Sequence, residues 1–211
     1  MSESKLELPR LVAITGQEGS GKDSYGDYLA ERGYMHVSAG DVMRTRARAQ
    51  GYADPLPRSV LSQVGDEMKR EFGPSPITAS TLAEYERRQP EFSAGLAISG
   101  LRRIGELKAF KGHGAVALWI DADDNRRFAN QSHRARSDQQ DLAAFLERSG
   151  VEYFGTTDGG EHGVNLRAIE ALADCRVSND GSLADLYHSA NAALSGFSVI
   201  PAQPHSPQIR E

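Results

Sequence analysis

The sequence predicts an α/β fold, a doubly wound parallel sheet with helices on both faces, and three observations support this. The segment Leu11–Thr15 (LVAIT) is short, apolar and β-branched, as a buried parallel strand requires. It stops at Gly16, and residues 22–32 then show helical spacing until Gly33 ends the pattern. The same order of strand, glycine turn and helix recurs along the chain, which favours parallel strands joined by helical crossovers.

The remaining elements follow from the same patterns in chain order. Further strands are predicted at 34–38, 96–99, 115–120 and 175–178, and further helices at 42–50, 60–72, 77–88, 166–173 and 183–194. Residues 126–148 are highly polar and 153–163 are rich in Gly and Thr, so we expect this stretch to face solvent and to be mobile. The segment 195–211 holds three prolines and is expected to be poorly ordered.

Composition places the chain among ordinary globular proteins. It has 211 residues, of which 39% are hydrophobic and 25% charged, enough for one well-packed domain. The net charge of −5 argues against a nucleic-acid partner, so any anionic ligand has to be met by a local basic cluster. No apolar run approaches the roughly 18 residues that span a bilayer, and the first residues lack a signal-peptide core. We therefore expect a cytoplasmic protein with no membrane partner.

Cysteine and histidine carry little chemistry in this sequence. Cys175 is the single cysteine, so it offers no internal disulfide and no metal-ligand spacing, and we expect a small buried apolar residue. The six histidines show no metal-ligand spacing either.

The strongest signal is the loop that follows the first strand. Residues 16–24 (GQEGSGKDS) fit the phosphate-binding pattern G-x-x-x-x-G-K. Glycines let the backbone curl with its N–H groups around a phosphate, and the helix that begins near Lys22 adds its positive dipole end. The loop therefore predicts ATP as a ligand, bound by Gly16, Glu18, Gly19, Ser20, Gly21, Lys22, Asp23 and Ser24.

The position after the lysine departs from the strict pattern, which has Ser or Thr there. Asp23 occupies it, and a hydroxyl follows one place later at Ser24. Either Ser24 takes the hydroxyl role near Mg²⁺ or the Asp23 carboxylate helps to hold the metal.

A second motif carries a family resemblance. Residues 37–44 (VSAGDVMR) closely resemble the segment (S/T)-x-G-D-x-x-R of adenylate-kinase-like nucleoside monophosphate kinases. In that family the arginine grips the acceptor's phosphate, which implies this role for Arg44, with Ser38, Gly40 and Asp41 beside the acceptor. A guanidinium fork also matches phosphate bidentately on physical grounds alone.

A third motif departs from the family. Residues 96–103 (LAISGLRR) resemble its strand ending in D-G-x-x-R or D-G-x-R, where the aspartate orients metal-bound water and the arginine binds phosphate. Ser99 stands in place of that aspartate, which leaves Asp23 or Asp121 to compensate. Arg102 or Arg103 is expected to bind the acceptor's phosphate.

Two later segments add to the resemblance. Arg126, Arg127, Arg134 and Arg136 are similar to the arginine-rich lid that closes over the γ-phosphate in these kinases. Residues 173–182 (ADCRVSNDGS) resemble the A-D-x-x-I-x-N-(D/E)-G-S ending of dephospho-CoA kinases and related archaeal proteins. There the turn lies against adenine, which implies this place for Asn179 and Gly181.

The resemblance covers roughly residues 11–194 and implies a P-loop kinase of three α/β/α layers. We expect one domain, 1–211, with a core at 11–194, an acceptor-binding insertion at 41–90, a lid at 126–163 and a tail at 195–211. Neutralisation of charge during transfer would fall to Lys22, Arg44, Arg102, Arg134 and Arg136.

The function expected is transfer of the γ-phosphate of Mg·ATP to a nucleoside or deoxynucleoside monophosphate. One rival is dephospho-CoA kinase, with Asp41 as base toward a ribose hydroxyl. Another is a regulator that binds ATP without turnover, which Ser99 would favour. The sequence indicates no oligomeric state.

Overall fold

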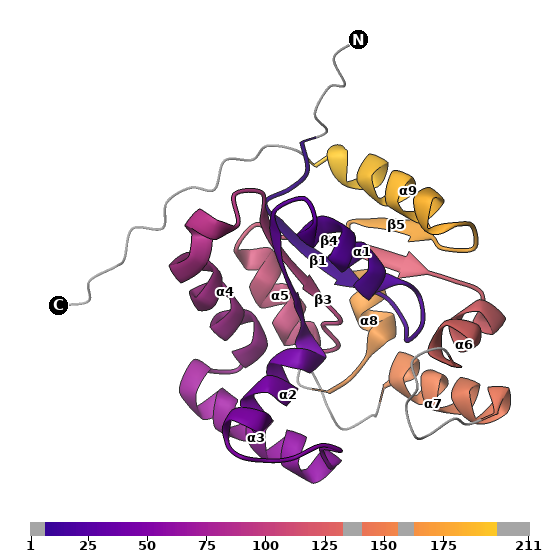
Figure 1. Ribbon diagram of the computed structural model, residues 1–211. Coiled ribbons are helices and arrows are strands. Elements are labelled where there is room, and N and C mark those ends of the chain that lie inside the picture. Colours follow the sequence, from indigo (N-terminus) through magenta and orange to yellow (C-terminus); the bar gives the residue numbers. More distant parts are fainter. Residues whose placement is uncertain (1–6, 133–140, 156–162, 198–211) are drawn as a thin grey trace.

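The computed structural model describes residues 7–132, 141–155 and 163–197. Within these residues one five-stranded sheet has the order β2-β3-β1-β4-β5, and every pairing is parallel. Figure 1 shows this sheet between two layers of helices. The strands are β1 (Leu11–Thr15), β2 (Tyr34–Ser38), β3 (Gly95–Ser99), β4 (Val116–Asp121) and β5 (Cys175–Ser178). The doubly wound, three-layer prediction is confirmed.

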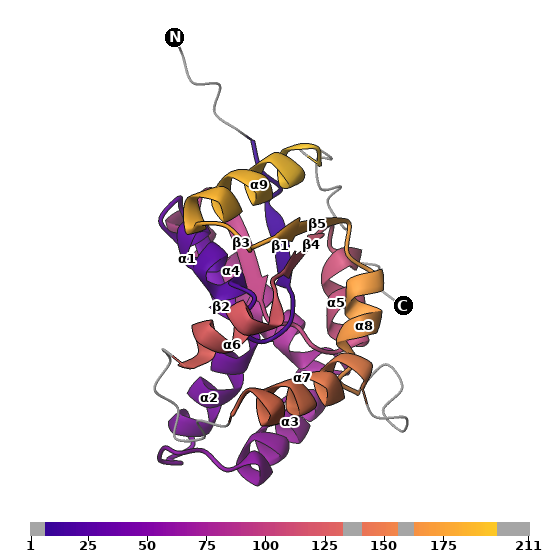
Figure 2. The same cartoon turned by 90° about the vertical axis from the view of Figure 1, so that its right-hand side faces the viewer.

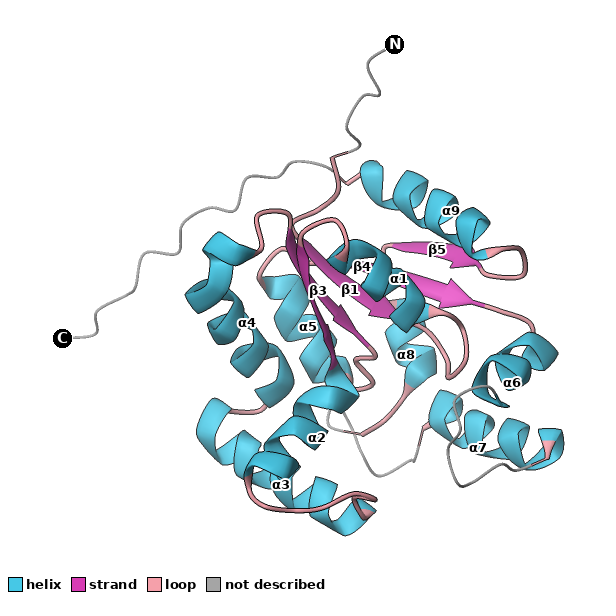
Figure 3. Ribbon diagram, viewed as in Figure 1, coloured by secondary structure: helices cyan, strands magenta, loops and turns pink. Residues whose placement is uncertain are grey.

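The helices divide into those that cover the sheet and those beyond the carboxyl ends of its strands. The covering helices are α1 (Lys22–Ala30), α4 (Pro76–Arg88), α5 (Ile104–Gly112), α8 (Leu166–Ala171) and α9 (Leu183–Ser195), with a short 3₁₀ turn η1 (Gln89–Glu91). The others are α2 (Ala39–Ala49), α3 (Arg58–Phe72), α6 (Asp124–Ser132) and α7 (Leu142–Phe154). Figures 2 and 3 show α2, α3, α6 and α7 together at one end of the molecule. Ligands of parallel α/β sheets bind at this end.

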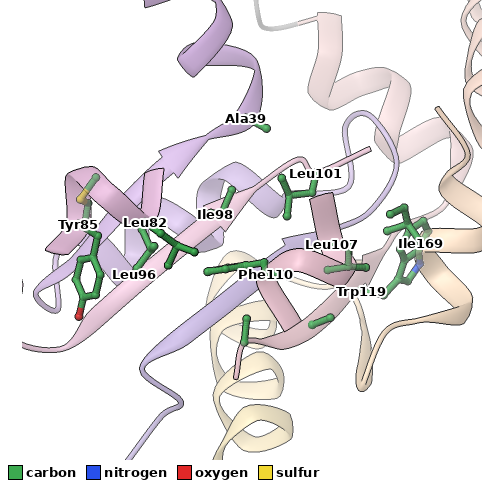
Figure 4. Close-up of a cluster of buried hydrophobic side chains, with 14 of the residues drawn as sticks. Ala39, Leu82, Tyr85, Leu96, Ile98, Leu101, Leu107, Phe110, Trp119 and Ile169 are labelled. Carbon is green, nitrogen blue, oxygen red and sulfur yellow. The ribbon is translucent and has the colours of Figure 1, made fainter. Parts of the chain in front are cut away.

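Each face of the sheet has its own apolar core. On one face Leu96 and Ile98 of β3 pack with Leu107 and Phe110 of α5, and Figure 4 shows this cluster. On the other face Tyr25 and Leu29 of α1 pack with Leu186 and Leu194 of α9. Burying one such side chain contributes roughly 1.5–3 kcal/mol, so the two cores fix the strand ends that carry the site.

Helices α2 and α3 have a separate, smaller core. Ala47, Val64 and Met68 are almost fully buried between α2 and α3, with partly buried apolar side chains around them. Glu106 of α5 connects to the start of α4, which follows α3. Its buried carboxylate accepts hydrogen bonds from the backbone N–H groups of Ile77 and Thr78 at 3.1 and 2.8 Å. The start of α4 is thereby capped from a neighbouring element.

Two helix boundaries differ from the prediction in an informative way. Helix α2 begins at Ala39 rather than at 42, because Ser38 is the extended N-cap and Gly40 and Asp41 already belong to the first turn. Helix α8 ends at Ala171 rather than 173. Residues 198–211 of the predicted tail lie outside the described part of the chain. None of the described helices has the length and apolarity needed to cross a membrane.

Candidate active site

The turn between β1 and α1 depends on glycines that lack side chains. Gly16, Gly19 and Gly21 have φ angles of 143°, 80° and 98°, which residues with a Cβ rarely adopt. A Cβ on Gly16 would lie 2.3 Å from the carbonyl oxygen of Ile120, and one on Gly19 would lie 2.2 Å from that of Arg127. Main chain of β4 and α6 therefore clasps the loop, and a larger residue at either position would force it apart.

The loop runs directly into the first turn of α1. Gly21 is the left-handed N-cap, and no side chain caps this helix start within the described residues. The first N–H groups of a helix have no partner within the helix, so they are available to an anion. Lys22 is only 8% exposed, and its Nζ donates to the carbonyl oxygen of Gln17 at 3.4 Å. The cation of the predicted phosphate lysine thus lies over the loop itself.

Asp23 meets the residue that departs from the family pattern. The Ser99 hydroxyl, which is fully buried at the end of β3, donates to Asp23 Oδ1 at 2.9 Å. Asp23 lines the main cavity, whereas Ser24 and Asp121 are not among its lining residues. Of the alternatives that the sequence left open, the structure therefore favours Asp23 for the carboxylate near the phosphates.

The turn after β5 supports the loop from behind. Asn179 is 2% exposed, and its Nδ2 donates to the carbonyl oxygen of Ser20 at 2.9 Å. Arg126 donates to the carbonyl oxygens of Asp180 and Gly181, which joins α6 to the same turn. Asn179 and Gly181 thus help to hold the loop, while contact between this turn and adenine stays a prediction.

The expectation that residues 126–148 face solvent is wrong for Arg127, although other described residues of this stretch, such as Ala129 and Glu147, are exposed as expected. Arg127 is 3% exposed and donates to the carbonyl oxygen of Glu18 at 3.3 Å and to Ser149 Oγ at 2.8 Å. Asn130 Nδ2 donates to the carbonyl oxygen of Gly19 at 2.8 Å. These polar side chains therefore contact the loop and α7 rather than solvent. Arg134 and Arg136 lie outside the described residues.

The first turn of α2 faces the loop across the cavity. Arg44 Nε and Nη2 donate to Asp41 Oδ1 at 3.0 and 2.7 Å. The guanidinium lies across Gly40, where a Cβ would be 3.0 Å from Nη2. Ser38, Gly40 and Arg44 line the cavity, whereas Asp41 is not among its lining residues. A helix start and a guanidinium therefore converge on one spot, as phosphate binding requires.

The two arginines after β3 differ in their contacts. Arg102 donates to Glu152 Oε1 of α7 at 2.6 Å, which links the sheet to the lid helices. Arg103 makes an isolated backbone bridge with Val164. Both side chains line the cavity, so an incoming phosphate would have to compete with Glu152 for Arg102.

All these groups meet in one cavity of about 850 Å³. Its lining cations come from α1, α2, the segment after β3 and α7. Its apolar lining comes from α2, α3, α4, α6, α7, the segment after β3 and the residues before α8. The cations are Lys22, Arg44, Arg102, Arg103 and Arg148; the apolar residues are Ala39, Met43, Leu61, Ile77, Leu101, Phe128, Phe145 and Val164. Five carboxylates line the same cavity, namely Glu18, Asp23, Glu106, Asp141 and Glu152, so an anionic ligand would meet individual cations rather than a uniformly basic surface.

Sequence reasoning missed the contribution of α7. Phe145, Arg148 and Glu152 all line the cavity, and Arg148 Nη2 lies 3.4 Å from Glu18 Oε2 of the loop. Their i, i+3, i+7 spacing places them on one helix face, which is the signal that was available.

Cys175 and the metal-binding residue types carry no further site in the described ranges. Cys175 is half-buried rather than buried, and burial raises the pKa of its thiol to about 11, which disfavours the nucleophilic thiolate. Among the described residues, no three or more His, Cys, Asp or Glu side chains gather as a metal centre would need.

The chain is similar in sequence to proteins named UPF0200. It is 29% identical over 182 residues to a UPF0200 protein of Methanothrix thermoacetophila, covering 82% of this chain and 90% of that protein. It is 27% identical over 185 residues to a UPF0200 protein of Methanocaldococcus jannaschii, covering 87% and 88%. No protein-family model matches the chain.

Solved structures show the same fold. TT1252 from Thermus thermophilus superposes with a TM-score of 0.56 at 19% identity, over 91% of this chain and all of that one. Shikimate kinase from Acinetobacter baumannii, in complex with shikimate, gives 0.53 at 13% identity, over 92% and 96%. The three-layer P-loop fold inferred from the motifs is thereby confirmed.

Proposed function

We propose that this protein is an ATP-dependent phosphotransferase that transfers the γ-phosphate to a nucleoside or deoxynucleoside monophosphate. One observation carries the proposal: a single cavity joins the glycine loop, with Lys22 and Asp23, to the first turn of α2, with Arg44. Each end of the cavity combines helix N–H groups with a cation, and each therefore suits a phosphate.

The chemistry needs no side-chain nucleophile. In-line transfer between two bound phosphates depends on positioning and on neutralising charge that spreads over the phosphoryl oxygens. Two of the lining cations contact the loop. Lys22 donates to the carbonyl oxygen of Gln17, and Arg148 pairs with the carboxylate of Glu18. Arg44 and Arg102 supply the acceptor side.

The donor set suits Mg²⁺ as the partner of ATP. Magnesium prefers carboxylate and hydroxyl oxygens together with substrate phosphates, and Asp23 and Ser99 offer one of each group at hydrogen-bond distance. When bound, the ion would offset the negative charge of the phosphates. Asp23 would hold it, and Ser99 would orient the carboxylate.

The lid helices would keep water from the transferred group. Phe128 of α6 and Phe145 of α7 line the cavity with apolar surface, and their rings lie 5.6 Å apart. A dry cavity strengthens the electrostatic contacts of the cations and limits hydrolysis of ATP.

The rival functions receive less support from the contacts. Asp41, the base that a dephospho-CoA kinase would need, is paired with Arg44 and is not a lining residue. A regulator without turnover was suggested by Ser99, which replaces an aspartate. Asp23 lies beside Ser99 and offers a carboxylate there, so this reason for expecting no turnover is weaker.

A coupled ADP-release screen with Mg·ATP tests the proposal. The acceptors are ribo- and deoxyribonucleoside monophosphates and dephospho-CoA, and Lys22→Ala is the negative control. We expect ADP release that depends on one or a few monophosphates. Release with dephospho-CoA alone would replace the proposed acceptor, and ATP binding without release on any acceptor would favour the regulator.

A further inference from the structure

Among the histidines that the structure describes, His36 is the one whose contacts lead into the site. Its Nε2 lies 3.1 Å from Ser99 Oγ, and its Nδ1 lies 3.1 Å from Asp27 Oδ1. Ser99 in turn donates to Asp23. We call the series Asp27, His36, Ser99 and Asp23 the relay. It runs from an exposed carboxylate on α1, through β2 and β3, back to the carboxylate that faces the cavity.

The strand register brings the relay together. β2 and β3 pair in parallel with His36 opposite Ala97 and Ser38 opposite Ser99. Since alternate residues of a strand share a face, His36 and Ser99 lie on the same side of the sheet, the side covered by α1. The His36 side chain is 10% exposed and that of Asp27 is 76% exposed.

A glycine in the middle of α1 makes room for the ring. A Cβ on Gly26 would lie 2.1 Å from His36 Nε2 and 2.3 Å from Cε1, so no other residue leaves the imidazole where it is. Gly inside a helix costs about 1 kcal/mol relative to Ala. Helix α1 carries this cost at the position where the ring lies.

The hydroxyl of Ser99 sets the direction of the hydrogen bonds. A serine has one proton to donate, and here it goes to Asp23. The Ser99 oxygen then has to accept from His36 Nε2–H, because a ring nitrogen without a proton would compete for the same hydroxyl hydrogen. The Asp27 carboxylate can only accept, so His36 Nδ1–H donates to it and the ring orientation is fixed from this side as well.

We propose that His36 is a positioning residue for the proposed kinase reaction: it holds the Ser99 hydroxyl toward Asp23 so that this carboxylate is oriented for the magnesium of the nucleotide. The inference rests on the proposed function. It also explains how a serine can stand where the family has aspartate, because carboxylate and hydroxyl have exchanged elements and His36 fixes the exchanged pair.

Metal-dependent binding of ATP is the first test. His36→Phe keeps a ring over Gly26 but removes both donors, His36→Gln restores one donor, and His113→Phe at the exposed end of α5 is the matched control. We expect His36→Phe to raise the Mg²⁺ concentration for half-maximal ATP binding about tenfold, as residues that orient a metal ligand typically do. ATP affinity without Mg²⁺ should stay within about twofold of wild type, and His36→Gln should recover part of the loss.

Equal loss of ATP affinity with and without Mg²⁺ would show that His36 only supports the fold and would overturn the proposal. An unchanged Mg²⁺ requirement in His36→Phe would overturn it as well. If wild-type protein binds no ATP under either condition, the proposed function itself fails, and the metal part of this inference fails with it.

A second measurement addresses the relay without any nucleotide. Long-range ¹H–¹⁵N correlation spectra of the free protein report whether His36 Nε2 carries a proton. We expect a protonated Nε2 whose resonance moves in Asp23→Asn, because this change alters the acceptor of the Ser99 hydroxyl. An unprotonated Nε2, or a spectrum unaffected by Asp23→Asn, would refute the relay even if the protein proves to be a kinase.

Discussion

The glycine loop and the acceptor-side helices α2–α4 are held in different ways. The loop is fixed by close main-chain packing, since Cβ atoms on Gly16 and Gly19 would lie 2.3 and 2.2 Å from backbone oxygens of β4 and α6, and by buried side chains such as Asn179 that donate to its carbonyl oxygens. The outer acceptor side depends on exposed pairs between long side chains, such as Arg48 with Asp54 at 2.9 Å. Only a small core, which includes Met68, lies beneath them.

This difference indicates that the glycine loop, rather than the proposed acceptor side, has its shape before ligands bind. Main-chain contacts do not depend on rotamers, so the donor side keeps its shape whatever occupies it. Exposed ion pairs contribute only about 0–1 kcal/mol each and exchange partners readily. We therefore expect the proposed acceptor side to be the half that adapts, and substitutions should affect the two halves differently.

Gly19→Ala should have the largest effect. The added Cβ collides with the carbonyl oxygen of Arg127 at a φ of 80°, so loop and α6 have to separate. We expect ATP affinity to fall by at least about a hundredfold, as the loss of several backbone donors implies. Calorimetric titration measures it. Gly112→Ala in α5 is the matched control, since a Cβ there meets nothing within 4 Å; similar affinities for the two variants would disprove the clasp.

Glu106→Gln should have the next largest effect, because it weakens the capping of the start of α4. The amide oxygen can accept from only one of Ile77 N–H and Thr78 N–H, and its NH₂ group then faces the other. We expect the free energy of unfolding in urea to fall by about 2 kcal/mol, the cost of an unsatisfied buried donor. Glu86→Gln on the exposed face of α4 should change it by less than about 0.5 kcal/mol. Equal values for both would contradict the capping role.

Arg44→Lys should act on the acceptor alone. Lysine keeps the charge but loses the planar fork, so we expect KM for the acceptor to rise about tenfold while ATP affinity stays unchanged. Arg48→Lys on the same helix, whose partner Asp54 lies outside the cavity, is the control. Steady-state kinetics with the acceptor found in the screen decide it, and a matching loss of ATP affinity would remove the distinction between the two halves.

Glu152→Gln should have the smallest effect and the opposite sign. Its carboxylate accepts from Arg102, whose side chain is 41% exposed, so losing this pair should lower the free energy of unfolding by no more than about 1 kcal/mol. The freed Arg102 should then lower KM for the acceptor about twofold to threefold. A higher KM would mean that Glu152 itself assists acceptor binding.

The sequence was most informative where structure is local. LVAIT is a strand at Leu11–Thr15 as predicted, because a β-branched run before a glycine loop leaves few alternatives. The glycine loop before α1 was found in the same way. Arg127 was misjudged, since its burial depends on Glu18 and Ser149, which lie 109 and 22 residues away. Ser99 and Asp23 are 76 residues apart, so only the folded sheet shows that they form a pair.

Binding of Mg·ATP to wild-type protein and to Lys22→Ala tests the central claim most directly. Lys22 is nearly buried over the loop, and its Nζ donates to Gln17 within it. We expect calorimetric titration to show saturable binding to wild type and a loss of at least about a hundredfold in Lys22→Ala, as removal of a phosphate's charged partner implies. Both proteins should unfold at similar temperatures. Absence of binding to wild type, or equal binding to both proteins, would contradict a phosphate site on this loop.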